Sequence, residues 1–214
     1  MPKIVDHDER RREVLSAAGR VIVRDGIDAA TTRAIAKEAG YSNGVLAHYF
    51  TDKDEILLSA LRQSHQRIRA RLTGKVTDAG GPGGSALAAL RELLLDNLPL
   101  DDERARETRL EVSFWSRSLA SERLAGVQRG EAGELRAAVR DLLGRARAAG
   151  ELRNSAAPDS PAAHDPHTDT DELDDCAEHL LALMDGLSLH LLLYPERLTR
   201  ADAERVMLRA LDRL

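Results

Sequence analysis

The amino-acid sequence predicts an all-α fold, and three observations support that prediction. The 214 residues are rich in Ala, Leu, Arg and Glu, which have high helix propensity. Val, Ile and aromatic residues, which favour strands, are scarce, and only 3% of the residues are aromatic. Apolar residues recur at helical spacing along the chain, and no segment shows the strict alternation of a half-buried strand.

Four helices are expected in the first third of the chain. The first ends at Asp25-Gly26, the second covers residues 32–39, the third ends near Tyr49, and a longer fourth begins at about residue 53. The residues expected to cap or to end these helices are Gly26, Thr31, Gly40, Ser42 and Asp52.

Residues 73–85 contain several glycines and Pro82, and they predict a flexible connection and a domain boundary. Further on, Gly150 is expected to end a helix, and Thr199 with Asp202 forms an approximate capping box. Residues 154–171 have three prolines and almost nothing to bury, so a mobile loop is expected there. The remaining helices are expected at about 85–97, 103–119, 121–149, 172–193 and 200–213.

Charge and composition limit the class of function. The net charge is −5, yet residues 1–72 hold 13 Lys and Arg against 10 Asp and Glu, whereas residues 73–214 hold 18 against 26. Any contact with a polyanion is therefore expected in the first third of the chain.

Cys176 has no partner cysteine in the chain, which excludes a disulfide framework. We find no signal peptide, and the longest apolar run, within 186–194, falls short of the ~20 residues of a membrane helix, so a soluble cytoplasmic protein is expected.

Residues 32–51 fit the geometry of a helix-turn-helix. Two short helices that cross closely need a small residue at their contact, which Ala36 supplies, and a turn residue that tolerates a left-handed φ, which Gly40 supplies. Leu46 provides the apolar anchor of the second helix. An ordinary helical hairpin would also accept these residues, so the spacing by itself leaves that alternative open.

The second helix of this pair also has a face suited to DNA. Gly44 and Ala47 are small enough for a close approach to base edges, and Ala47 could meet a thymine methyl group. Ser42 and the N–H groups of the first turn could receive a phosphate, while Tyr49 and Lys53 are of the right type to bind further phosphates.

The segment from Thr31 to Leu57, TTRAIAKEAGYSNGVLAHYFTDKDEIL, closely resembles the signature of TetR-family transcriptional regulators. The match extends from about residue 10 to 57. The resemblance implies an all-helical homodimer, with a three-helix helix-turn-helix DNA-binding domain over 1–52 and a helical effector-binding and dimerisation domain over 53–214. It further implies a ligand-responsive repressor that binds a palindromic operator and is released by a small-molecule effector.

The resemblance also assigns roles to individual residues. It makes 42–49 the recognition helix, whose base-facing residues would be Asn43, Gly44 and His48. Many relatives have Tyr where this sequence has Ala47, so one contact typical of the family is missing. The complete set of expected DNA-binding residues is Thr32, Arg33, Ser42, Asn43, Gly44, Val45, His48, Tyr49 and Lys53.

The C-terminal part resembles, more weakly, the branch that includes BetI-like repressors of choline metabolism. Phe114-Trp115 and the run Met184-Asp185-Gly186-Leu187 support this, but they do not predict a choline-related ligand. The candidate effector-binding residues are Leu110, Phe114, Trp115, Met184, Asp185 and His190, although apolar residues in such stripes are more often simply core. The last two helices are expected to form the dimer face, with Leu189, Leu192, Val206, Leu208 and Leu211.

Other functions are less well supported by the sequence. His164, Asp165, His167 and Asp169 could ligate a metal, but a proline-rich loop is a poor cage, so neither a metal nor a cofactor is expected. No nucleophile–base pair or catalytic motif favours an enzyme. A lone thiol such as Cys176 is more often a packed residue than a redox switch. The remaining alternatives are a helical interaction module and an activator-type regulator without a small-molecule effector.

Overall fold

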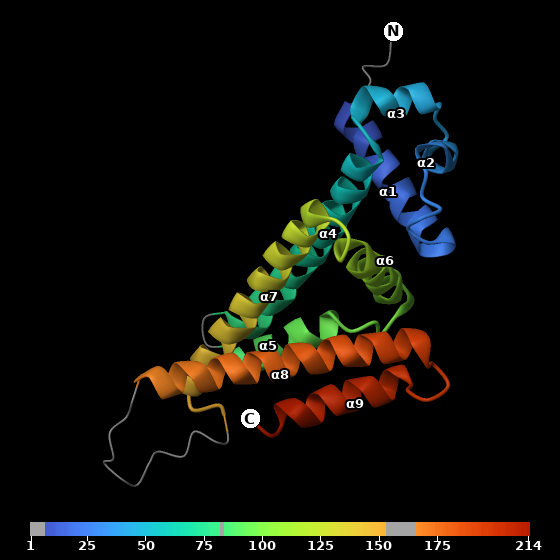
Figure 1. Cartoon of the computed structure of the whole chain (residues 1–214). Helices are drawn as coiled ribbons and strands as arrows, with labels where there is room; N and C mark the ends of the chain where they lie inside the picture. Colours follow the sequence, from blue (N-terminus) through green and yellow to red (C-terminus); the bar gives the residue numbers. More distant parts are fainter. Residues whose placement is uncertain (1–6, 82–83, 153–165) are drawn as a thin grey trace. The chain divides into compact units, whose positions relative to one another are not determined.

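The computed structural model describes residues 7–81, 84–152 and 166–214, and the described residues form helices and connecting turns without any strand (Figure 1). The predicted all-α class is therefore confirmed. In chain order the helices are α1 (His7–Asp25), α2 (Thr32–Ala39), α3 (Asn43–Tyr49), α4 (Lys53–Gly80), α5 (Ala86–Asp96), α6 (Asp102–Ser118), α7 (Glu122–Ala148), α8 (Pro166–Leu193) and α9 (Arg200–Leu211).

The predicted helix ends are confirmed where side chains cap the backbone. Thr31 Oγ1 accepts a hydrogen bond from the Ala34 N–H at 3.1 Å, at the start of α2. Gly40 ends α2 with φ +74°, a left-handed conformation in which a side chain would be strained. Thr199 and Asp202 form the predicted capping box of α9, and the hydrogen bonds from Thr199 and Arg205 lower the pKa of Asp202 to about 2.

The chain folds as two compact units. Unit one comprises the residues up to Ile68 together with Arg109–Arg129. Its core joins α1, α2 and α3 to the first half of α4 and also includes side chains of α6 and α7. The largest fully buried side chains of this core are Ile22, Ile35, Leu46, Ile56, Leu57, Leu61, Phe114 and Leu124.

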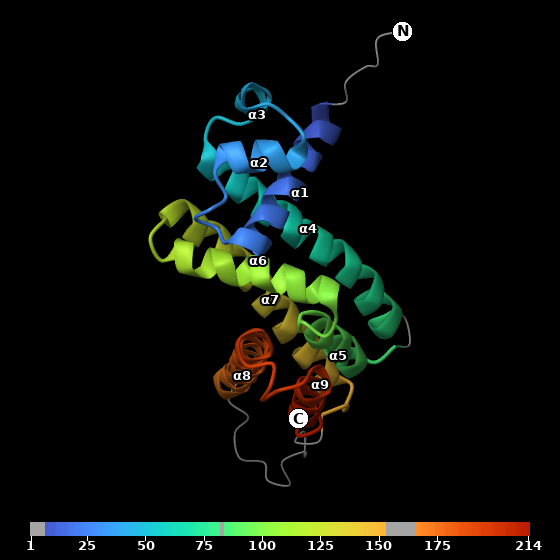
Figure 2. The ribbon, with the colours of Figure 1, turned by 90° about the vertical axis from the view of Figure 1, so that its right-hand side faces the viewer.

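Unit two comprises Arg69–Thr108 and Gly130–Leu214. Within it α8 and α9 lie side by side in both ribbon views (Figures 1 and 2). Leu211, which the sequence assigned to a dimer face, is only 5% exposed and belongs to the core of its own chain. The buried core of this unit includes Leu90, Leu94, Val139, Leu143, Leu180, Met184, Ala203 and Met207.

Two predicted loops are partly helical, so those predictions were wrong. Residues 73–80 continue α4, because Val76 and Ala79 pack against the core of unit two, and this packing outweighs the cost of about 1 kcal/mol for Gly74 inside a helix. Residues 166–171 begin α8, since Pro166 stands in the first turn, where a missing N–H costs no hydrogen bond. The rest of the predicted loop, residues 154–165, lies outside the described residues.

Helix α8 is long and apolar enough over Glu172–Leu193 to cross a membrane, judged by length and composition only. The core helix of a soluble protein passes the same test. Leu180, Met184 and Leu187 of this segment are buried in the core of unit two, although only 28% of the apolar window is buried. This apolar segment is therefore weak evidence for a membrane span.

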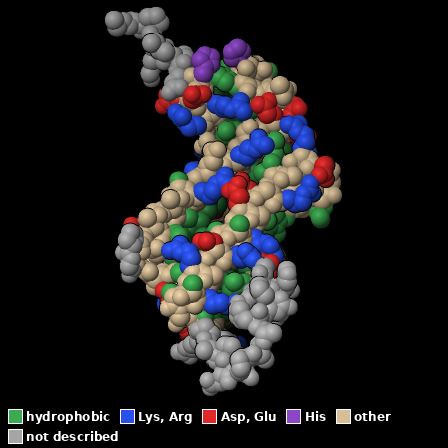
Figure 3. Space-filling view, turned by 90° about the vertical axis from the view of Figure 1, so that its left-hand side faces the viewer, with side chains coloured by type: hydrophobic (Ala, Val, Ile, Leu, Met, Phe, Trp, Pro, Cys, Tyr) green, Lys and Arg blue, Asp and Glu red, His purple; other side chains and the backbone are tan. Residues whose placement is uncertain are grey.

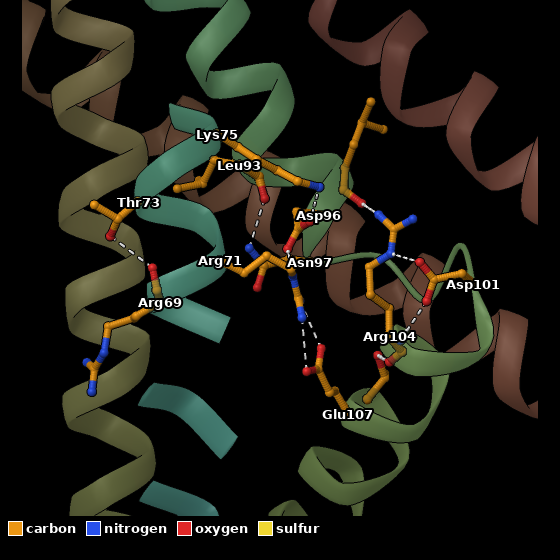
Figure 4. A network of polar contacts seen from close by, with 12 residues as sticks. Arg69, Arg71, Thr73, Lys75, Leu93, Asp96, Asn97, Asp101, Arg104 and Glu107 are labelled. Atoms are coloured by element: carbon orange, nitrogen blue, oxygen red, sulfur yellow. Dashed lines mark hydrogen bonds and ion pairs between the residues drawn. The ribbon is translucent and has the colours of Figure 1, made fainter. Parts of the chain in front are cut away.

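Charged side chains connect α4 to α5 and α6 within unit two, around the buried carboxylate of Asp96 (Figure 4). Lys75 Nζ donates to Asp96 Oδ1 at 2.6 Å, and Arg71 Nε donates to Asp96 Oδ2 at 2.8 Å. The remaining Arg71 donors make a bidentate pair with Glu107 at 3.0 and 2.8 Å. Burial by itself would raise the pKa of Asp96, but the hydrogen bonds from Lys75 and Arg71 lower it below its ordinary value.

Candidate nucleic-acid interface

Helices α2 and α3 form the predicted helix-turn-helix. The Tyr41 N–H donates to the Ala36 carbonyl at 2.9 Å and the Gly40 N–H to the Lys37 carbonyl at 3.2 Å, which closes the end of α2. Ala36 is 3% exposed and Leu46 is 1% exposed. The small residue and the apolar anchor that the spacing indicated are therefore both buried in the core of unit one.

The opposite face of α3 points to solvent. Asn43, Gly44, Ala47 and His48 are exposed, whereas Val45 and Tyr49 are half-buried. A helix of seven residues with one side fixed in the core and small or polar residues on the other can enter a major groove.

Helix α1 adds two residues to this surface that the sequence analysis missed, His7 and Arg10. They line a shallow hollow together with Ser42, Gly44, Val45, His48 and Tyr49. The ring centroids of His7 and His48 are 6.1 Å apart, and each ring lies 5.5 Å from the Tyr49 ring. No signal in the sequence connects His7 with His48, because packing between helices distant in sequence brings them together.

A second hollow lies between α2 and the start of α3. It is lined by Arg33, Ala36, Lys37, Tyr41 and Asn43. Arg33 and Lys37 are exposed and stand one helical turn apart, and within the described part of the chain neither has a carboxylate at ion-pair distance. Lys37 was also missed, although its i, i+4 spacing from Arg33 is a signal that could have found it.

Nearby carboxylates are occupied by partners inside unit one. Glu38 accepts from Arg20 and Arg24 at 2.8 Å each, and these hydrogen bonds hold its pKa below the ordinary value. Glu55 accepts from the Thr51 N–H at 2.7 Å, and this bond, joined by those from the Thr51 hydroxyl and Arg11, lowers its pKa. These two carboxylates therefore already have their charge compensated.

Two of the predicted phosphate contacts also stabilise the fold. Lys53 Nζ donates to the carbonyls of Ile27 and Asp28 at 3.5 and 3.4 Å, so this ammonium group anchors the loop between α1 and α2. The carbonyl of Tyr49 accepts from Arg11 at 2.7 Å, which ties the end of α3 to α1. Thr32 is half-buried at the start of α2, and Ser42 is exposed, with its hydroxyl capping α3.

The predicted effector residues lie in different surroundings. Leu110 and Phe114 are buried in the core of unit one, and Met184 is buried in the core of unit two. Asp185 and His190 are exposed on α8. A role for any of them in effector binding stays a prediction.

Trp115 belongs to a polar cluster on neighbouring helices of unit one. It is half-buried, and its Nε1 donates to Glu111 Oε1 at 3.3 Å. His65 of α4, only 8% exposed, contacts the other oxygen of the same carboxylate at 2.7 Å.

The other reactive candidates are Cys176 and the His and Asp residues of the predicted loop. Cys176 is half-buried, and burial raises the pKa of its thiol, which suits a packed residue. Of the loop residues considered for a metal, His164 and Asp165 lie outside the described residues, as do the side chains of His167 and Asp169.

The family comparisons match both parts of the chain. Residues 14–60 match the bacterial regulatory proteins of the tetR family, and residues 86–164 and 161–214 match the C-terminal domain of BetI-type transcriptional repressors. The HTH-type transcriptional regulator PksA of Bacillus subtilis is 30% identical over 212 residues, which cover 99% of this chain and 93% of PksA. BetI of Stenotrophomonas maltophilia is 33% identical over 129 residues, 60% of this chain and 64% of that protein.

Solved structures agree with these matches. A transcriptional regulator from Rhodococcus sp. Rha1 has a TM-score of 0.76 at 26% identity, covering 94% of this chain and 93% of that one. A regulator from Saccharomonospora viridis, solved in complex with choline, has the same fold, with a TM-score of 0.80 at 22% identity and coverage of 94% and 95%. With its helix-turn-helix and its C-terminal domain of BetI type, the chain belongs to the TetR family of bacterial regulatory proteins and is a DNA-binding transcriptional regulator.

Proposed function

We propose that this regulator is a repressor that binds a palindromic operator as a homodimer and releases it when a small molecule binds. The observation that carries the proposal is the exposed face of α3, whose small and polar residues are surrounded by the cations of α1 and α2. In this proposal residues 1–52 contact DNA, and residues 53–214 dimerise and bind the effector. This is a division by role, since the core of unit one extends beyond residue 52.

On the DNA, the α3 residues Asn43, Gly44 and His48 would face base edges in the major groove. Val45 and Ser42 flank them. Thr32, Arg33, Tyr49 and Lys53 would contact phosphates, which position the protein without reading the sequence.

The last two helices are proposed as the dimer face. Leu193 is 60% exposed at the end of α8, and the Leu189, Leu192, Val206 and Leu208 side chains are only partly buried within the chain. Two-fold symmetry would place the same patch of a second copy on them and form a four-helix bundle. The two recognition helices would then reach successive major grooves, about 34–36 Å apart.

The proposal is tested by selecting duplexes from a random library with the full-length protein and titrating the recovered duplex against salt. Recovery of a palindrome, binding by a dimer in analytical ultracentrifugation, and affinity that falls with salt would support it.

Candidate effectors are then tested for release of that duplex, with choline first because one fold neighbour was solved with it. A monomer on DNA, or a half-site without symmetry, would contradict the dimeric operator. Activation of a reporter gene by the protein would contradict repression.

Gly44→Ala tests the close approach of α3 to DNA. Among the described residues, a Cβ atom at this position would meet only Ser42 Oγ, at the ordinary contact distance of 3.8 Å, and Ala has a higher helix propensity than Gly. We therefore expect unchanged or slightly increased thermal stability, together with an affinity for the selected duplex about 5- to 150-fold lower, since a lost base contact is worth about 1–3 kcal/mol. Gly126→Ala in α7, where a Cβ atom would have nothing within 4 Å, is the matched control and should keep full affinity. Equal DNA binding by Gly44→Ala would show that this part of α3 does not approach the bases.

Lys53 and Asn43 test the division between phosphate and base contacts. Lys53→Met should weaken binding to all duplexes about equally and reduce the slope of log K against log salt by about 1. Asn43→Ala should instead change the order of preference among duplexes with single base-pair changes and leave the salt slope unchanged. Because Lys53 also anchors the loop after α1, the stability of Lys53→Met is measured alongside. If both variants changed sequence preference in the same way, the division would be wrong.

A further inference from the structure

Two histidines from distant parts of the sequence meet on the surface proposed to contact DNA. His7 is the first residue of α1 and His48 stands near the end of α3, with ring centroids 6.1 Å apart and Tyr49 in contact with both. Both imidazoles are exposed, and histidine side chains are visible at the surface over this end of unit one (Figure 3). They therefore line an open hollow instead of filling a core.

The charged groups around the pair are few and are mostly occupied. Arg10 of α1 lines the same hollow, and Tyr49 is the other titratable side chain in its wall. Arg11 of α1 points to the Tyr49 carbonyl and pairs with Glu55 of α4 at 3.2 Å. Asp8 and Glu9 follow His7 on α1, are exposed, and do not line the hollow. Among the described residues, the lining of the hollow thus contains one permanent cation, two imidazoles and no carboxylate.

We propose that His7 and Arg10 extend the DNA-contacting surface to α1, and that His7, which lies beside His48, takes up a proton when a DNA phosphate enters the hollow. The proposal rests on the proposed use of α3 for DNA contact and adds to it a dependence of affinity on pH. His7 and Arg10 thereby become part of the binding surface, although the family signature over 31–57 does not include them.

The chemistry follows from the donors that imidazole offers. A neutral ring has one N–H donor, whereas a protonated ring has two donors and a positive charge that strengthens each hydrogen bond to phosphate. A phosphate placed beside the ring favours the protonated form, because the opposite charges attract. DNA binding therefore favours the protonated form, so affinity is highest at low pH and falls as the pH rises through the range in which histidine titrates.

The test uses the full-length protein and the fluorescently labelled duplex recovered by selection, with binding followed by anisotropy at pH 6, 7 and 8 and constant ionic strength. Wild-type protein should bind at least about tenfold more tightly at pH 6 than at pH 8, as expected for uptake of one or more protons. His7→Gln should reduce that ratio and the affinity at pH 6. His7→Lys keeps a permanent charge and should restore tight binding at pH 8 while reducing the ratio, a rescue that a merely structural role for His7 would not produce. His179→Gln, which changes an exposed histidine of α8, is the control and should keep the wild-type ratio.

Tight binding by the wild type with the same affinity at all three pH values would overturn the proton uptake and leave the proposed function standing. The same would follow if His7→Gln kept the full pH dependence. Failure to bind any selected or random duplex at every pH would instead overturn the proposed function and this inference together.

Discussion

Phe114→Ala is expected to lower the free energy of unfolding by about 3–5 kcal/mol, the typical cost of removing a fully buried aromatic ring. Phe114 is 0% exposed and packs in the core of unit one, which also holds Leu110 and Leu124. Its removal takes away the transfer free energy of the ring and leaves a cavity that the helices can only partly close. Urea unfolding followed by the fluorescence of Trp115, the one tryptophan of the chain, measures the change next to the substituted residue.

Leu119→Ala is the matched control, because Leu119 follows the same helix and is 92% exposed, so its truncation should leave stability nearly unchanged. The measurement also decides between the two interpretations of Phe114 that its sequence pattern permits. A variant with wild-type stability that no longer responds to an effector would make Phe114 a pocket wall. A strongly destabilised variant would make it a core residue.

The case of Phe114 shows what apolar spacing can and cannot predict. Spacing indicated correctly that Leu110 and Phe114 share a helical face, but it does not specify what that face contacts. Local signals performed better: Thr31, Gly40, Ser42 and Thr199 determine helix ends through hydrogen bonds to residues three or four positions away.

Features that depend on distant partners were missed for a common physical reason. Residues 73–80 were predicted to be flexible because Gly74 and Gly80 are poor helix formers, but packing of Val76 and Ala79 against unit two outweighs that preference. In the candidate interface, the family signature indicated the residues of α2 and α3. It gave no reason to include His7 or Arg10, which reach α3 only through the packing of α1.

Asp96→Asn has the second large expected effect, a decrease of about 3 kcal/mol in the free energy of unfolding, because it removes the buried carboxylate that Lys75 and Arg71 share. The Asp96 side chain is 1% exposed, and both of its oxygens accept hydrogen bonds from cationic groups of α4. Arg71 keeps its bidentate pair with Glu107, and Lys75 is 44% exposed and can turn to water, which places the loss at the lower end of the usual range. Asp102→Asn makes the same chemical change in an exposed ion pair with Arg200 and should have no measurable effect on stability.

The pH dependence of stability distinguishes the loss of this charge from a simple change in packing. The pKa of Asp96 is lower in the folded protein than its ordinary value of 3.8, so the unfolded chain binds the proton first as the pH falls. The stabilisation by Asp96 is therefore fully present above the unfolded pKa and is lost as the pH falls through the folded one. Asp96→Asn has no such proton to bind, so the difference in stability between wild type and variant should be constant from pH 7 to pH 5 and shrink below about pH 4. If the difference in the free energy of unfolding stayed constant down to pH 3, the destabilisation would come from the shape and packing of the substituted amide. The ion pairs of Asp96 with Lys75 and Arg71 would then not stabilise the contact of α4 with α5.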